Sequence, residues 1–153
     1  MTYPLLRRVQ RRIKLHLTGV LLCLLMAACA TESSSPTMMN PPLPENPLAS
    51  CPDSPNCIRQ TRLFDLPPDT LFARAQTALD ALSASTLSVT PETRRIDAVF
   101  TVFLFKDDLA LAVEPHKEGA ALHIRSASRV GYSDFGVNRR RVERFFRALK
   151  NQR

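Results

Sequence analysis

The sequence has no acidic residue before Glu32 and no apolar run long enough to cross a membrane. Five basic residues near the start precede an apolar run from about Leu17 to Ala28, roughly 12 residues where a spanning helix needs roughly 20. A basic segment, a short apolar run and small residues at its end are the parts of a secretory signal. Residues 1–28 are therefore predicted to be an export signal and not a lasting transmembrane helix.

The chain after this signal also lacks a strong charge of either sign. The formal net charge of +7 arises from 21 basic and 14 acidic residues. Because five of the basic residues lie in the signal, the remainder has 16 basic against 14 acidic residues, a net charge of +2. A near-neutral domain offers no general attraction to a polyanion, so nucleic acid is not expected as a partner.

The residues that end the signal, Leu25-Met26-Ala27-Ala28-Cys29, resemble a lipobox, with Met26 where leucine is more usual. In a lipobox the cysteine is acylated before cleavage, and several acyl chains hold a protein firmly on a membrane. We expect a lipidated Cys29 that binds the chain to the membrane of the cell envelope. Ala30 after this cysteine predicts the outer membrane, facing the periplasm, by analogy with lipoprotein sorting in enteric bacteria. The alternative is a plain cleavage site beside an ordinary cysteine.

Recognisable catalytic and cofactor motifs are missing. The chain contains no Walker phosphate loop, no catalytic-serine elbow and no HExxH helix, so no cofactor is expected. His116 and His123 are the only histidines after the signal, and their spacing falls outside the usual zinc-finger pattern, so no metal is expected. No catalytic residue is assigned from local sequence.

Cys51 and Cys57 enclose a short loop, Pro52-Asp53-Ser54-Pro55-Asn56, that two prolines shape. An exported protein resides where disulfides persist, so a disulfide between these cysteines is predicted. A metal site or a reactive cysteine is the less favoured alternative, because no further ligand or base stands nearby in the sequence.

Composition divides the chain into a signal at 1–28, a tether at 29–50 and one domain at 51–150. The tether is rich in serine and proline, which cannot bury a core. In the domain, the apolar pattern predicts the order strand, helix, four strands, helix: an α+β fold with an antiparallel sheet of four to five strands and two helices packed on one face. The expected elements are strands at 62–66, 87–90, 95–105, 109–115 and 121–127, a helix at 70–84 capped by Asp69, and a C-terminal helix capped by Asp134.

The segment from Arg125 to Arg139 gathers hydroxyl, guanidinium, carboxyl and amide groups where the last strand leads into the C-terminal helix. Helix N-termini and arginine forks favour anions, so one interpretation is a pocket for an anionic ligand. The alternative is structural: Asp134 caps the helix and Arg129 pairs with Asp134 or Asp97. The basic run Arg139–Arg141, with Arg144 and Arg147, is expected on the solvated face of the helix.

Three motifs resemble the bacterial and plant family catalogued as domain of unknown function 1499: CPDSPNC at 51–57, RIDAVF at 95–100 and SASRVGYSDFGVNRRRVE at 126–143. The resemblance covers nearly all of residues 51–150 and implies one compact domain, without implying a reaction. It directs attention to the polar residues of these motifs as candidate ligand-binding residues: Asp97, Ser126, Ser128, Arg129, Asp134, Asn138 and Arg139.

These observations predict a non-enzymatic envelope module that binds a small anionic ligand or a protein partner near the loop at 129–139. The first alternative is a hydrolase or transferase that uses the carboxylates of Asp97 and Asp134. The second is a purely structural lipoprotein.

Overall fold

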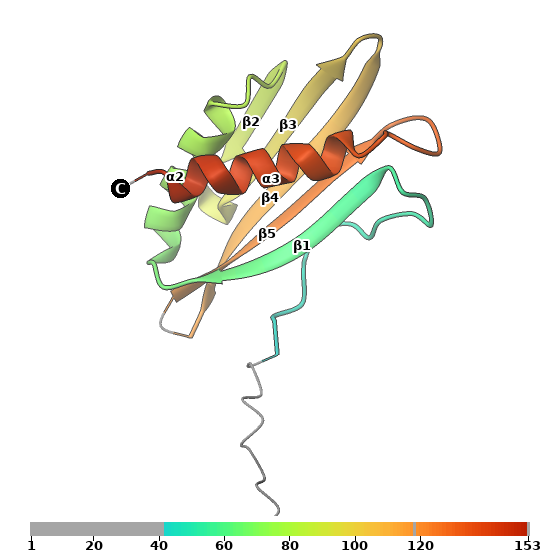
Figure 1. Cartoon of the computed structure of the whole chain (residues 1–153). Helices are drawn as coiled ribbons and strands as arrows, with labels where there is room; N and C mark the ends of the chain where they lie inside the picture. Colours follow the sequence, from blue (N-terminus) through green and yellow to red (C-terminus); the bar gives the residue numbers. More distant parts are fainter. Residues whose placement is uncertain (1–41, 118, 153) are drawn as a thin grey trace, which may run out of the picture. The chain divides into compact units, whose positions relative to one another are not determined.

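A computed structural model describes residues 42–117 and 119–152, which form one antiparallel sheet with two helices (Figure 1). The five strands lie in the order β1-β5-β4-β3-β2, and the chain order of strand, helix, four strands, helix confirms the predicted α+β class. The elements are β1 (Cys57–Phe64), α2 (Pro68–Asp80), β2 (Thr86–Thr90), a 3₁₀ turn at Pro91–Thr93, β3 (Arg95–Val102), β4 (Phe105–His116), β5 (Gly119–Ser128) and α3 (Val137–Lys150).

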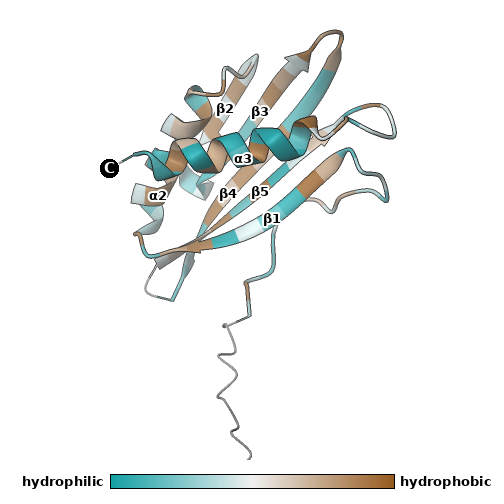
Figure 2. Cartoon of the chain, viewed as in Figure 1, coloured by the Kyte–Doolittle hydropathy of each residue, from teal (hydrophilic) through white to brown (hydrophobic). Residues whose placement is uncertain are grey.

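The core lies between the sheet and the two helices. Successive side chains of a strand point to opposite faces, and every second residue is buried along β3, whereas residues 120–124 of β5 are buried on both faces. Figure 2 shows apolar residues alternating with hydrophilic residues along α3. The core residues include Leu71, Leu79, Ile96, Leu109, Leu111, Val113, Leu122, Ile124, Val142 and Phe145.

The hairpin between β3 and β4 corrects the sequence prediction. A strand was expected to run through Phe105 and to turn at residues 106–108, yet β3 ends at Val102 and pairs there with Phe105. The turn is therefore Phe103-Leu104, with Phe103 in the left-handed region at φ 55°. Two-residue turns usually carry glycine, asparagine or aspartate at such positions, so two large apolar residues gave no turn signal.

The helix α2 begins and ends earlier than its predicted bounds of 70–84. Pro67 is its N-cap and Pro68 its first helical residue, which suits proline because that position needs no N–H donor. Asp69 therefore lies in the first turn and is not the cap. β1 likewise begins at Cys57, five residues before its predicted start, because the segment after Cys57 has no regular alternation of apolar residues.

The other face of the sheet is partly covered by the segment before the disulfide loop, which crosses β1. Leu48 is buried there, and Arg59 Nε donates to its carbonyl at 3.2 Å. Asn46 Nδ2 donates to Gln60 O at 3.2 Å and to Thr61 Oγ1 at 3.1 Å. The segment thus adds polar and apolar contacts along an edge strand.

The domain is complete within the described residues. The described residues belong to one compact unit, which contains all helices, strands and core residues named above. A chain that begins at residue 42 therefore carries the whole fold. No helix among the described residues is long and apolar enough to span a membrane. The predicted signal and Cys29 lie outside the described residues.

Candidate functional site

The disulfide loop is fastened to the start of α3. Cys51 and Cys57 are joined, with an S–S distance of 2.03 Å, as predicted. The carbonyl of Asn56 accepts hydrogen bonds from Ser128 N at 3.0 Å and from Asn138 Nδ2 at 3.1 Å. The side chain of Asn56 also donates to the carbonyl of Gly131. The disulfide loop, the end of β5 and the loop before α3 are therefore one connected unit.

Asn138 lies at the centre of a buried hydrogen-bond network. Ser126 Oγ donates to Asn138 Oδ1 at 2.6 Å, and Asn138 Nδ2 lies 3.0 Å from Ser128 Oγ and 2.9 Å from Asp134 Oδ2. Ser126 and Asn138 are both buried. The structure brings these four predicted residues together, and they satisfy one another's hydrogen bonds.

An ion pair that sequence analysis missed adjoins this network. Arg141 NH2 lies 2.7 Å from Asp107 Oδ2, and the two side chains are only 2% and 4% exposed. Arg141 NH1 also lies 3.1 Å from Ser126 Oγ, and the guanidinium carbon lies 4.4 Å from the centre of the Phe100 ring. Arg141 was expected on the solvated helix face and Asp107 in a turn; both expectations are wrong.

Asp134 caps α3 from two residues before the N-cap, Gly136. Its Oδ1 accepts from Gly136 N at 3.0 Å, and its Oδ2 accepts from Asn138 N at 2.6 Å. Burial would raise the pKa of Asp134, but the hydrogen bonds from Asn138 and Gly136 outweigh it, so the pKa lies below its ordinary value. The carboxylate is thus held charged by backbone donors, as a capping group is.

The remaining predicted residues lie apart from the network. Arg129 forms a two-pronged ion pair with Asp108, at 2.7 Å and 3.0 Å, and with neither acid that the sequence suggested. This hydrogen-bonded pair raises the pKa of Arg129. Asp97 faces away from the helices and pairs with Arg95 at 2.9 Å. Arg139 is exposed in the first turn of α3.

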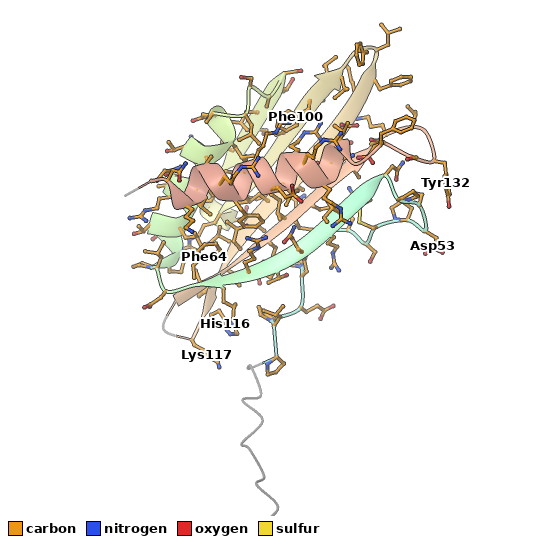
Figure 3. All side chains as sticks on the ribbon, viewed as in Figure 1. Asp53, Phe64, Phe100, His116, Lys117 and Tyr132 are labelled. Atoms are coloured by element: carbon orange, nitrogen blue, oxygen red, sulfur yellow. A yellow bond between two sulfur atoms is a disulfide. The ribbon has the colours of Figure 1, made fainter. Side chains whose placement is uncertain are left out.

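Large apolar side chains are exposed at the end of the sheet where the β3–β4 turn and the loop before α3 lie. Phe103 and Leu104 are each 93% exposed, and Phe135 is 88% exposed. Phe105, Val130 and Tyr132 are exposed there as well, and Figure 3 shows Tyr132 projecting from the loop near Asp53 of the disulfide loop. Exposed apolar residues that cluster in this way mark interaction sites.

Four of these exposed side chains, Phe103, Phe105, Val130 and Phe135, line an open concavity of about 530 Å³, which we call the hairpin groove. Its apolar lining residues are Val102, Phe103, Phe105, Val130, Phe135 and Val137. Asp107, Ser128 and Asp134 also line it, and each of the three is engaged by the network or the ion pair described above. Phe103 and Phe135 both adopt the left-handed backbone region, at φ 55° and 50°. Such strain in a bulky residue is typical of functional loops.

The structure separates the two carboxylates of the enzyme alternative. Asp97 and Asp134, the two carboxylates of the enzyme alternative, lie on opposite sides of the sheet. Among residues 42–117 and 119–152, no three acidic, histidine or cysteine side chains gather as a metal would require. The groove therefore presents an apolar surface, and the polar side chains beneath it are already hydrogen-bonded to one another.

Comparisons with known proteins place the domain in a family. No curated protein matches the sequence significantly. Three similar solved structures are protein CV1439 from Chromobacterium violaceum (14% identity, TM-score 0.47, covering 62% of this chain and 95% of that one), Ara h 8.0201 (10%, 0.46, 61% and 94%) and TTHA0849 from Thermus thermophilus (14%, 0.43, 61% and 94%). The family model described as protein of unknown function (DUF1499) matches residues 47–149. The disulfide loop, the sheet and nearly all of α3 fall within this match, and the chain belongs to that family.

Proposed function

We propose that this chain is a lipid-anchored, non-enzymatic envelope module that binds an apolar segment of an envelope protein in the hairpin groove. The observation that carries the proposal is the cluster of exposed apolar side chains around the groove, led by Phe103, Leu104 and Phe135. In water these side chains expose apolar area, and the removal of such area from water contributes roughly 25 cal/mol per Å² before the costs of association are subtracted. A protein partner provides that burial.

The shape of the site supports a protein partner. Interface energy concentrates where an apolar or aromatic side chain fills a pocket that excludes water. The groove offers such a pocket, and the exposed aromatic rings at its rim offer the contacts that surround it. A small anion would bind less favourably at this end of the domain. Arg129 is already paired with Asp108, and the carboxylates of Asp107 and Asp134 line the groove.

Site-specific photo-crosslinking in cells tests this proposal. A benzophenone amino acid at position 104 of the full chain should form a discrete protein adduct, because Leu104 is almost fully exposed beside the groove. The same group at Thr77, an exposed position on α2, is the control. The adduct should disappear when Phe135→Ser is added. Adducts with lipid alone, or equal adducts from both positions, would contradict a protein partner.

Lipid anchoring is a separate part of the proposal and has its own test. The lipobox-like end at Cys29 supports acylation, and a firm anchor needs more than one acyl chain. Labelling with a radioactive fatty acid should mark the full chain and not Cys29→Ser. Separation of the two membranes should recover the labelled protein in the outer membrane, because Ala30 follows the cysteine. Label on the serine variant, or recovery in the inner membrane, would overturn the corresponding claim.

A further inference from the structure

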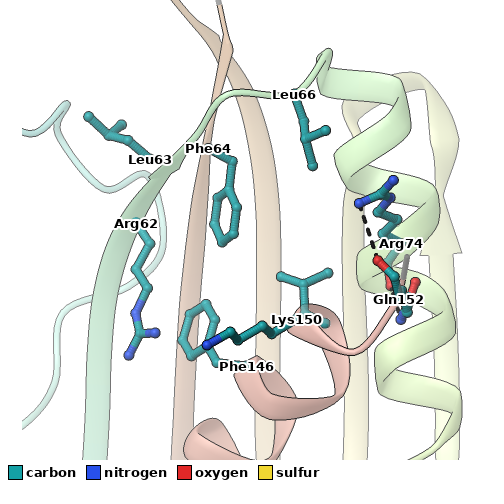
Figure 4. Close-up of a pocket in the computed structure, with 9 residues that line it drawn as sticks. Arg62, Leu63, Phe64, Leu66, Arg74, Phe146, Lys150 and Gln152 are labelled. Carbon is teal, nitrogen blue, oxygen red and sulfur yellow. Dashed lines mark hydrogen bonds between the residues drawn. The ribbon is translucent and has the colours of Figure 1, made fainter.

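A second concavity, of about 390 Å³, lies at the other end of α3 from the hairpin groove (Figure 4). Its floor is apolar and comes from three elements: Phe64 at the end of β1, Leu66 before α2, and Phe146 and Leu149 on α3. Arg62, Arg74 and Lys150 line the same space. We call this concavity the basic cleft.

The charge of the basic cleft has one sign. Its lining residues include three cations and no acidic residue. None of the ion pairs found within residues 42–117 and 119–152 involves Arg62, Arg74 or Lys150. By contrast, the larger concavity beside Arg140, Arg144 and Arg147, of about 570 Å³, also includes Glu143. In the basic cleft an apolar floor therefore coincides with cations that none of the ion pairs within the described residues neutralises.

The cations are arranged around the apolar floor. The guanidinium carbon of Arg62 lies 3.6 Å from the centre of the Phe146 ring, and Figure 4 shows Lys150 extending across the same ring toward Arg62. Arg74 on α2 is linked to the end of the chain, because Gln152 Nε2 donates to its carbonyl at 3.0 Å. Like charges near one another repel, and a bound anion would relieve that repulsion.

We propose that the basic cleft binds a single-chain anionic amphiphile of the fatty-acid class. The acyl chain lies on Phe64, Leu66 and Phe146, and the carboxylate accepts charge-assisted hydrogen bonds from Arg62 and Lys150. Small-molecule sites combine a mainly apolar lining with a few placed polar groups in roughly this range of volume. The proposal is independent of the hairpin groove and of its protein partner.

Displacement of a dansyl-labelled fatty acid from residues 42–153, below the micelle concentration, tests this proposal. The wild-type domain should bind the fatty acid saturably and bind the alcohol of the same chain length at least about tenfold more weakly, since a charge-assisted hydrogen bond corresponds to about a tenfold change in affinity or more. The preference for the acid should shrink at high salt.

Two matched variants locate the site. Arg62→Gln with Lys150→Gln should weaken acid binding about tenfold and leave alcohol binding unchanged. Arg144→Gln with Arg147→Gln removes the same charge outside the cleft and should leave both affinities unchanged. Equal affinity for acid and alcohol, equal weakening by both double variants, or no saturable binding would overturn the proposal.

Discussion

The buried pair of Arg141 and Asp107 provides the sharpest test of how the family motif stabilises the domain. Arg141→Met replaces the guanidinium with an apolar side chain and leaves the Asp107 carboxylate buried without its 2.7 Å partner. Removal of one partner of a buried pair costs about 3–5 kcal/mol, because the other charge stays desolvated. A small domain has about 5–15 kcal/mol of stability in total. We therefore expect the variant to lose about a fifth or more of its stability, with a Tm more than about 10 °C lower.

The double variant Asp107→Leu with Arg141→Met distinguishes two quantities. One is the destabilisation caused by a buried unpaired charge, and the other is the net contribution of the ion pair to the free energy of unfolding. Replacement of both partners by apolar residues is often nearly neutral, so most of the lost stability should return. Arg141→Lys is the charge-preserving control, and it should remain destabilised because an ammonium cannot bond Asp107, Ser126 and Asn138 together.

Urea unfolding of residues 42–153, followed by circular dichroism, measures these free energies. Two results would refute the reasoning. One is a loss of less than about 1 kcal/mol in Arg141→Met, which would mean that the pair is hydrated in solution. The other is a destabilisation of the double variant that equals the sum for Arg141→Met and Asp107→Leu made singly, which would mean that the two residues are not coupled.

Three further perturbations address the rest of the domain. Asp134→Ala should lower the free energy of unfolding by about 0.5–2 kcal/mol at neutral pH. Because the folded pKa of Asp134 is depressed, its contribution should decline as pH falls below about 4 and be lost as pH falls through the lower folded pKa, and a difference unchanged below both pKa values would count against a capping carboxylate. His123 is fully buried, and desolvation lowers its pKa despite Glu114, so stability should fall as pH drops below about 6.5; urea melts of His123→Gln should show that slope flattened. Replacement of Cys51 and Cys57 by serine should cost about 2 kcal/mol by the loop-entropy relation, and an unchanged Tm would show that the loop is held by hydrogen bonds alone.

The sequence predicts the sheet and both helices because period-two and helical spacing follow directly from burial on one face. The same helical spacing also indicated the buried ion pair of Arg141, which the sequence analysis did not predict. Asn138 and Arg141 stand one helical turn before Val142 and Phe145, on the stripe that faces the core, and only their polarity suggested solvent. A polar residue on an apolar stripe indicates a buried partner, which in this fold is Asp107 on a neighbouring strand.

The exposed end of the domain is less predictable for a different reason. Alternation assigns Phe103, Leu104 and Phe105 to a strand, since apolar residues are normally read as buried. Their exposure depends on a turn that contains none of the usual turn residues, and it is fixed by the pairing of Val102 with Phe105. The residues around the turn do not by themselves predict that strand register.

The disulfide also determines how mechanical load enters the domain. A pull on the chain before residue 46 first meets the hydrogen bonds of Asn46 and Arg59. Once these break, the covalent link from Cys51 to Cys57 carries the force past the intervening loop and delivers it to the first residue of β1. The loop between the two cysteines therefore cannot extend under force. The edge strand β1, held to β5 from Cys57 to Phe64, becomes the element whose detachment sets the force that the fold withstands.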